Sequence, residues 1–295
     1  MDTTTVDTGD NLTDRTSGYL LMSDEASEIE MHGVSKFVLS REYRRSMMKD
    51  ATRMSDKDID EYFTAQRPGF ETDHDHVTSV ALSLCRIYLS CKDAFPTPQM
   101  KSEWAPAVWH EACTKTRVNL DPSMRSELAN GSMKLFIDAK KRVTDAVEIF
   151  YGFDTMHTSD SVGNNATLAQ ALLSDKSFVH MRPDLNPPWY PYQHIVIEKA
   201  IKTTWFRKRV DDGVVFREYF SPLPVPAIAF ALTLIECCID EWTDGTHQET
   251  SWDEERFKIA YQSHVRSLDD FRKLGPAQGY NSFEYIRSSL LNVAR

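Results

Sequence analysis

The sequence predicts a mainly α protein, an irregular helical bundle around one buried central helix, with a disordered acidic N-terminus. Apolar residues recur at helical spacing in several long segments of the chain. Eleven Gly and 13 Pro in 295 residues supply too few turn signals for a sandwich or barrel of many strands. Residues 226–243 are apolar on nearly all sides, which is typical of a helix enclosed by other helices.

The N-terminal stretch differs in composition from the rest of the chain. Residues 1–35 are rich in Asp, Glu, Ser and Thr and hold one basic residue, Arg15. Such a segment buries too little apolar surface to offset the entropy lost on ordering, so we expect disorder. Residues 1–75 carry 17 acidic and 9 basic side chains, whereas residues 76–295 carry 27 and 25. We divide the chain into an acidic tail, loosely attached short helices, an all-helical domain and a C-terminal helix (1–35, 36–75, 76–274 and 275–295).

Helical patterns follow one another through the first half of the chain. Short helices are expected over residues 36–54 and 55–66, the second with Ser55 as N-cap and Asp58 three residues later. Residues 76–92 give the clearest periodicity. Their apolar face consists of Val77, Val80, Ala81, Leu84, Ile87, Tyr88 and Cys91. Further helices are predicted over residues 101–115, 121–151 (with Asp121 and Pro122 at its start) and 166–173.

The second half opens with a segment in which no regular element is expected, because residues 181–192 hold four prolines. A helix resumes at Gln193, and Val214 to Phe216 suggest a short strand. Three prolines lead into the central helix, 226–243. The last long helix is predicted to begin at a capping box, Ser251 to Glu254, and to close at Gly275-Pro276, before a weaker helix over 282–293.

Several segments of the all-helical domain share the pattern of a known family. They are KSFVHMRPD, HIVIEKAIKTTWF, DDGVVFREYFSPLPVPAIAF, ALTLIECCIDEWTDG and FKIAYQSHVRSLDDF. Together they resemble a basidiomycete fungal family, domain of unknown function 6532, over residues 76–274. The resemblance implies a fungal intracellular protein with an all-helical domain, and it assigns no catalytic residue.

Composition disfavours several classes of protein. The balanced charge of residues 76–295 lacks the broad positive surface of a nucleic-acid binder. The longest apolar run, Val225 to Ile235, is too short to cross a bilayer, so no membrane partner is expected. Five cysteines without a C-x-x-C pair suggest reduced, packed thiols and a place in the cytoplasm or nucleus. No dinucleotide, P-loop, zincin or esterase motif is present, and no cofactor is predicted.

The best metal-like cluster is Asp73-His74-Asp75-His76, in which His74 and His76 are candidate ligands of a divalent ion. The alternative is that Asp73 or Asp75 caps the helix that starts near His76. We favour the alternative, because no second half-site of matching spacing follows in the sequence.

Three residues near the central helix are candidates for acid–base chemistry. Glu236 lies in the most apolar helix, Asp240 follows one turn later, and His264 lies on the apolar face of the last long helix. A buried carboxylate with a raised pKa is a common general acid. We favour the alternatives that Glu236 pairs with an Arg, a Lys or a backbone group of a neighbouring helix, and that His264 is a core histidine.

Two further segments are candidate binding surfaces. Trp189, Tyr190 and Tyr192 could line a groove for a peptide, or could pin their own loop across the bundle, which we favour. A basic stripe at helical spacing offers a surface for nucleic acid or an acidic partner, although a solvated helix face is the simpler interpretation. The stripe consists of Arg41, Arg44, Arg45, Lys49 and Arg53, and any nucleic-acid contact is expected only within residues 41–53.

Two functions of different classes fit these observations. The favoured one is a non-catalytic protein-interaction module, and the alternative is an enzyme of unrecognised type with a carboxylate and histidine pocket near Glu236. An enzyme needs a concave pocket with several polar groups that lack structural partners. A binding module needs an exposed apolar or charged patch.

Overall fold

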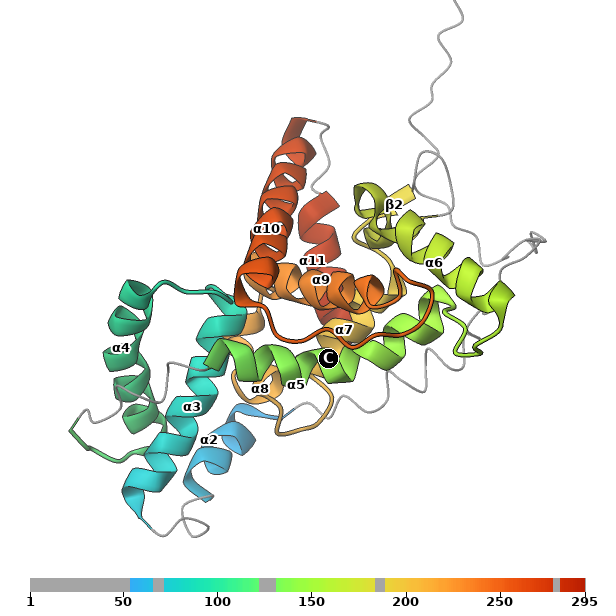
Figure 1. Ribbon diagram of the computed structural model, residues 1–295. Coiled ribbons are helices and arrows are strands. Elements are labelled where there is room, and N and C mark those ends of the chain that lie inside the picture. The colour runs from blue at the N-terminus through green and yellow to red at the C-terminus, as the bar shows by residue number, and fades with distance from the viewer. Residues whose placement is uncertain (1–53, 66–71, 122–130, 184–188, 278–281, 295) are drawn as a thin grey trace, which may run out of the picture. The chain divides into compact units, whose positions relative to one another are not determined.

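A computed structural model describes residues 54–65, 72–121, 131–183, 189–277 and 282–294 (Figure 1). The helices of the first half are α2 (Asp56–Ala65), α3 (Asp73–Cys91), α4 (Pro98–Thr116), α5 (Gly131–Tyr151) and α6 (Ser159–Leu173). After the 3-10 turn η2 (Ser174–Val179) come the strands β1 (His180–Arg182) and β2 (Trp189–Pro191). The second half holds α7 (Ile195–Trp205), α8 (Asp212–Val215), η3 (Arg217–Phe220), α9 (Val225–Asp240), α10 (Glu254–Ala277) and α11 (Ser282–Ala294). The predicted tail 1–35 and helix 36–54, apart from Met54, lie outside the described residues.

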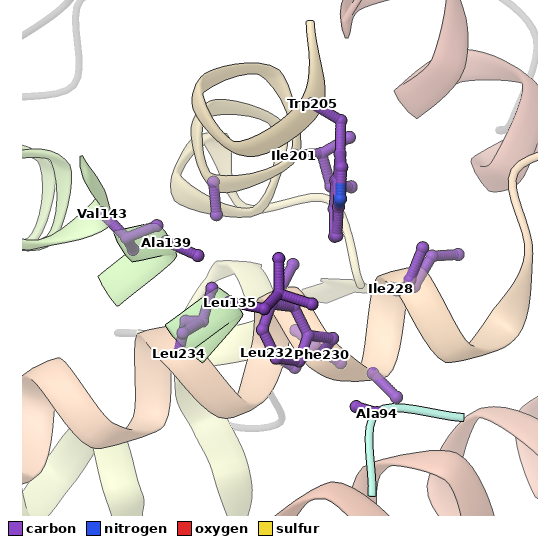
Figure 2. Packing of buried hydrophobic residues seen from close by; sticks show 14 of the residues in the cluster. Ala94, Leu135, Ala139, Val143, Ile201, Trp205, Ile228, Phe230, Leu232 and Leu234 are labelled. Carbon is purple, nitrogen blue, oxygen red and sulfur yellow. The ribbon is translucent and has the colours of Figure 1, made fainter. Parts of the chain in front are cut away.

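The mainly α fold is confirmed, and α9 is its central helix. Every residue from Ala227 to Ile239 except Glu236 is buried. The helices α5, α7 and α10 pack against it. Figure 2 shows side chains of α9 gathered with Leu135 and Ala139 of α5 and Trp205 of α7. An apolar helix of this kind is stable only when other elements cover all of its faces.

Aromatic rings join α9 to its neighbours. Phe136 of α5 meets Phe230 edge to face, with ring centroids 6.1 Å apart, and stacks on Phe257 of α10 at 4.3 Å. Trp252, just before α10, packs against the same Phe136 ring at 4.9 Å. Helix α5 and the two consecutive helices α9 and α10 therefore share one aromatic cluster.

Helix starts follow local capping chemistry, with two corrections to the predictions. The capping box at Ser55 is confirmed, because Asp58 N donates to Ser55 Oγ (3.1 Å) and Ser55 N donates to Asp58 Oδ2 (2.9 Å). The N-cap of α3 is Thr72, whose hydroxyl accepts from Asp75 N, and not Asp73 or Asp75. The helix α10 begins at Glu254, where Asp253 Oδ1 accepts from Arg256 N (3.1 Å), so Ser251 is not its cap. In both cases a neighbouring side-chain oxygen that also favours the N-cap takes the position.

Helix α6 is longer than predicted, because a capping box of Thr158 and Ser161 starts it seven residues before the expected 166. Its first two turns are polar and carry no apolar stripe, so periodicity alone missed them. Helix α10 continues past Gly275-Pro276 to Ala277, so that pair does not close it. A proline in a last turn removes a single backbone hydrogen bond, which a helix end tolerates.

Two further predictions were wrong. Residues 181–192 were expected to lack regular structure, but β1 and β2 form an antiparallel pair in which His180 lies opposite Pro191 and Arg182 opposite Trp189. A two-stranded pair has only edge strands, where proline is tolerated. The expected strand at 214–216 is helical instead: Val214 N and Val215 N both donate to Asp211 O, at 2.9 and 3.1 Å. No helix in the described parts of the chain is long and apolar enough to cross a membrane.

Because α9 is the central helix, we expect a substitution at Phe230, which is 1% exposed, to lower stability. Phe230→Ala should lower the free energy of unfolding by about 3–5 kcal/mol, the range for removal of a buried aromatic ring. Urea unfolding of the purified protein measures this loss. The control Ile259→Ala, at a 57% exposed position of α10, should cost less than about 0.5 kcal/mol. A loss below about 1 kcal/mol for Phe230→Ala would contradict the central placement.

His194 gives the fold a pH dependence. The ring stacks on Tyr151 with centroids 4.4 Å apart, and its Nδ1 accepts from Val196 N at the start of α7. Burial lowers the pKa of His194 to about 4. The unfolded chain binds a proton near pH 6.5, so stability is fully present above that pH and is lost as the pH falls toward 4.

His194→Asn should therefore flatten the loss of stability between pH 6.5 and 4. Asn retains N-cap capacity but does not titrate. In the wild type this histidine accounts for about 3 kcal/mol of the loss, from 1.36 kcal/mol per pKa unit. Urea unfolding at the two pH values measures the slope, and the exposed His110→Asn is the control. Equal slopes in the wild type and His194→Asn would contradict the assignment.

Candidate functional site

Two of the predicted site residues meet. Glu236 of α9 and His264 of α10 form a pair, with Glu236 Oε2 2.5 Å from His264 Nε2. The side chain of Glu236 is 30% exposed, whereas that of His264 is fully buried. The prediction that Glu236 pairs with a neighbouring helix holds, but its partner is this histidine and not an Arg, a Lys or a backbone group.

A lysine from η2 completes this cluster. Lys176 Nζ donates to Ser263 Oγ (2.7 Å) and Ser267 Oγ (3.1 Å), both on α10. Lys176 and Asp175 have φ values of 54° and 49°, a left-handed conformation that is costly for residues other than glycine. Burial lowers the pKa of Lys176, while the negative charge of Glu236 acts in the opposite direction. The strained turn thus directs a cation toward α10, near the carboxylate.

The electrostatics of the pair do not suit a general acid. Burial acts to raise the pKa of Glu236, but the hydrogen bond and charge of His264, with Lys176 and Arg256, lower the pKa overall. Burial lowers the pKa of His264, against the effect of Glu236. The arrangement is therefore a carboxylate held in its ionised form by hydrogen bonding and nearby charge. A general acid at neutral pH needs the opposite shift of the carboxyl pKa.

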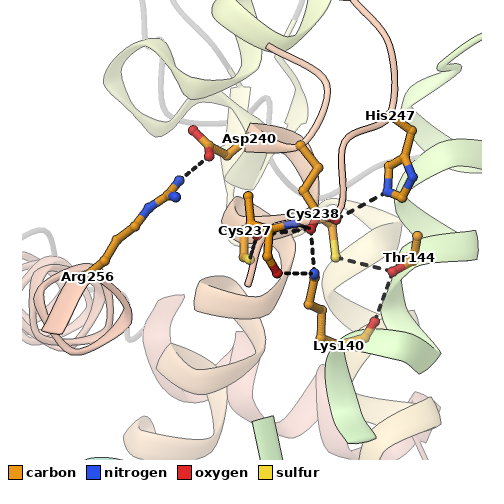
Figure 3. A network of polar contacts seen from close by, with 9 residues as sticks. Lys140, Thr144, Cys237, Cys238, Asp240, His247 and Arg256 are labelled. Atoms are coloured by element: carbon orange, nitrogen blue, oxygen red, sulfur yellow. Dashed lines mark hydrogen bonds and ion pairs between the residues drawn. The ribbon is translucent and has the colours of Figure 1, made fainter. Parts of the chain in front are cut away.

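The second nitrogen of His264 is also poorly placed for catalysis. Its Nδ1 has no hydrogen-bond partner among the described residues, and the ring meets Phe178 edge to face at 5.9 Å. A fully buried nitrogen beside an aromatic ring does not reach a substrate in this conformation. Asp240, the third candidate, forms an ion pair with Arg256 at the surface (Figure 3). Glu236 and Asp240 of α9 therefore connect this helix to His264 and Arg256 of α10.

A second polar cluster escaped the sequence analysis. Glu241, the C-cap of α9, is 1% exposed and pairs with Lys140 of α5. Its Oε1 also accepts from Thr250 N (2.6 Å) and Thr250 Oγ1 (3.0 Å), and His247 Nε2 lies 3.2 Å from its Oε2. Figure 3 shows this network beside Cys237 and Cys238. Nothing local marks Glu241, because its partners are 6 to 101 residues away along the chain.

The thiols next to this network are unreactive. Cys237 and Cys238 are buried, and burial raises the pKa of Cys237 to about 11 and that of Cys238 further. A thiol of high pKa carries little thiolate at neutral pH and is a weak nucleophile. All five cysteines are free.

The metal candidates do not share one environment. His74 is exposed, with its ring tilted against that of Trp109 at a centroid distance of 5.6 Å, whereas His76 is 0% exposed. Residues two positions apart on a helix point in different directions. Among the described residues no group of three or more His, Cys, Asp or Glu side chains is placed to hold a metal ion.

The aromatic candidates differ in exposure, and the basic candidates lie outside the described residues. Tyr192 is 7% exposed and packs on Phe271 of α10 at 5.2 Å, as a pinned loop requires. Tyr190 is 39% exposed, and the side chain of Trp189 lies outside the described part of the structure. The basic residues Arg41, Arg44, Arg45, Lys49 and Arg53 also lie outside it.

The structure contains a cavity of about 510 Å³ that the sequence did not predict. It lies between α3, α5, the end of α7 and the segment that joins α7 to α8. Its apolar lining comes from Leu82, Cys85, Leu89, Leu135, Ala139, Trp205 and Val210. Its polar lining comes from Arg86, Lys134, Asp138, Arg142, Thr204, Asp211 and Asp212. Leu82 and Val210 are 36% and 53% exposed, so apolar surface reaches solvent at the cavity.

One ion pair lies in the lining of this cavity. Arg86 of α3 donates from Nε to Asp212 Oδ2 (2.9 Å) and from Nη2 to Asp212 Oδ1 (3.0 Å), a bidentate geometry. Burial acts to lower the pKa of Arg86, but the bonds to Asp212 raise it overall. Trp205, on the cavity floor, donates its Nε1–H to Ser90 Oγ (2.9 Å). These polar groups therefore already have structural partners.

The model of one family matches residues 80–271, about two thirds of the chain. The chain belongs to the family described as domain of unknown function (DUF6532). The match contains α9, most of α3 and α10, and every residue that lines the cavity. The DUF6532 description itself assigns no activity. Among curated proteins and solved structures, none matches the chain.

The pairing of Glu236 with His264 lets us predict how substitutions at Glu236 change the free energy of unfolding. Glu236→Leu leaves buried His264 without its partner and should cost about 1–3 kcal/mol, the penalty for an unsatisfied buried group. Glu236→Gln retains an acceptor oxygen and should cost less. Urea unfolding at neutral pH measures both. Asp240→Leu is the matched control, because it removes a surface ion pair of the same helix, worth about 0–1 kcal/mol. A Glu236→Leu variant as stable as the wild type would contradict the structural role.

Proposed function

We propose that this chain is a non-catalytic protein-interaction module, and that its cavity receives an apolar side chain of a partner protein. The observation that carries the proposal is the cavity of about 510 Å³, with an apolar floor that opens to solvent at Leu82 and Val210. Interface anchors are apolar or aromatic side chains that fill such pockets, surrounded by a polar rim.

The pairing of Arg86 with Asp212, of Trp205 with Ser90 and of Glu236 with His264 supports binding over catalysis at those groups. In the cavity, Arg86 and Asp212 hold each other, and the indole N–H of Trp205 is bonded to Ser90. An active site needs several convergent polar groups free for a substrate. At Glu236 the carboxylate is bound to His264, and the pKa shift is opposite to that of a general acid.

We further propose a fungal, intracellular protein, in the cytoplasm or the nucleus. The family resemblance supports the fungal origin. Five free cysteines, three of them buried, support a reducing compartment, because secreted proteins use cysteines mainly in disulfides.

A selection with displayed peptides tests the binding function. The full-length protein is immobilised, and short random peptides that bind it are enriched. The enriched peptides should share an apolar residue. The double variant Leu82→Glu/Val210→Glu should weaken them by at least about tenfold in fluorescence anisotropy, since each change places a charge at the apolar mouth.

Met156→Glu, at a 64% exposed position that does not line the cavity, is the control and should bind as the wild type does. Thermal unfolding of each variant verifies that the fold is retained. The proposal fails if no peptide is enriched, or if the enriched peptides bind the double variant as tightly as the wild type.

A further inference from the structure

A short helix outside the family match packs on the matched domain. The helix α2 (Asp56–Ala65) precedes the matched residues 80–271 and contacts α4. It has 10 residues, and isolated helices shorter than about 12–15 residues are marginal in water. The helical conformation of α2 therefore depends on the surface against which it packs.

That surface pairs with the acidic residues of α2. Three arginines, one at the end of α4, one between α7 and α8 and one in η3, each form an ion pair with an aspartate of the helix. The pairs are Arg117–Asp60 (2.6 Å), Arg209–Asp58 (3.2 Å) and Arg217–Asp56. Arg217 Nη1 also donates to Met54 O (2.9 Å). All three arginines belong to the part of the chain that the family model matches.

One aromatic ring of α2 is buried against the domain. Phe63 is 4% exposed, and its ring lies 5.4 Å from that of Phe216. Lys115 Nζ of α4 lies 5.3 Å from the centroids of both rings. Lys115 is paired within the domain, with Glu218 at 2.8 Å and Glu111 at 3.8 Å. The cations paired with α2 are therefore the three arginines.

The order of residues along α2 matches this surface. Ile59, Tyr62 and Phe63 form one stripe of the helix. At about 100° per residue, Asp58 lies along one edge of the stripe and the other two aspartates lie along the opposite edge. The helix thus has an apolar stripe with carboxylates on both sides.

The contacts that hold α2 are few. Its three ion pairs are exposed, and exposed ion pairs stabilise little because water and salt screen them. Between Met54 and Thr64, only Met54 and Phe63 are buried. A second helix with the same pattern makes equivalent contacts and so competes with α2.

We propose that the α2-binding surface, formed by Lys115, Arg117, Arg209, Phe216 and Arg217, also binds an acidic amphipathic helix of a partner protein in competition with α2. An acidic helix is complementary in charge to the three arginines, and a helix commonly docks through its apolar stripe. The expected pattern is that of residues 56–63: acidic, any, acidic, apolar, acidic, any, aromatic, aromatic. None of the five surface residues lines the cavity, so this inference goes beyond the proposed function and does not depend on the cavity.

A labelled synthetic peptide of residues 54–65 tests the competition on the full-length protein. In fluorescence anisotropy it should bind the variant Asp56→Asn/Asp58→Asn/Asp60→Asn at least about tenfold more tightly than the wild type, because the weakened internal helix competes less. A peptide with Asn at the same three positions should bind this variant at least about tenfold more weakly, and the difference should shrink as salt rises. Phe63→Ala in the full-length chain should favour the peptide in the same direction. Thermal unfolding verifies that each variant folds.

The arginines are tested in the same Asn variant. Adding Arg117→Gln/Arg209→Gln should weaken the peptide at least about tenfold. Arg266→Gln/Arg272→Gln removes the same charge at exposed positions of α10 and should leave the binding of the peptide unchanged.

Random displayed peptides of the same length, selected on the Asn variant, test for a partner helix. The enriched peptides should carry acidic residues on both sides of an apolar stripe, and the 54–65 peptide should displace them. Light scattering of the wild type and the Asn variant tests whether a second copy of the chain takes the surface instead. Both should be monomers at the concentrations used for binding.

Four outcomes overturn the inference. They are equal or undetectable binding of the 54–65 peptide to the wild type and the Asn variant, binding that survives Arg117→Gln/Arg209→Gln, a selection without peptides that the 54–65 peptide displaces, and a wild-type dimer that the Asn variant loses. The last outcome assigns the surface to a second copy. The cavity is tested separately by Leu82→Glu/Val210→Glu, so the failure of either proposal leaves the other standing.

Discussion

The enclosure of α9 is the constraint on which the rest of the structure depends. A helix that is apolar on nearly all sides has no face to expose, so every side must meet another element. Helices α5, α7 and α10 meet this need, and α3 and α6 also contact α9. Residues from Ala227 to Ile235 are accordingly all buried, and the polar groups of α9 gather in its last turns.

The carboxylates at the end of α9 hold neighbouring segments of the chain against it. Glu236 and Glu241 lie at the C-terminal end of α9. Each is bound by a residue from elsewhere in the chain, Glu236 by His264 and Glu241 by Lys140. Removing a carboxylate from water is unfavourable unless hydrogen bonds replace the lost solvation. Their partners supply those bonds and so fix α10, α5 and the segment after α9 against the central helix.

The sequence was sufficient for features set by local pattern and insufficient for those set by distant contacts. The apolar composition of α9 and the capping box at Ser55 were predicted correctly, because both depend on near neighbours. The partner of Glu236 lies 28 residues away, and Arg86 and Asp212 lie 126 residues apart. The cavity between α3, α5 and the segment before α8 therefore had no signal in any single stretch. The strand predicted at Val214 failed because the carbonyl of Asp211 accepts its N–H locally.

The cavity is a place where close packing is not completed, and the Arg86–Asp212 pair is part of its lining. Protein interiors are normally filled to the density of organic crystals. Here a bidentate ion pair joins α3 to the start of α8. Trp205 is 1% exposed, whereas Leu82 and Val210 of the same lining remain partly in solvent. Exposed apolar area costs about 25 cal/mol per Å², which a partner side chain recovers on binding. The pair neutralises its own charges, and the other charged residues of the lining are two basic ones, Lys134 and Arg142, and two acidic ones, Asp138 and Asp211.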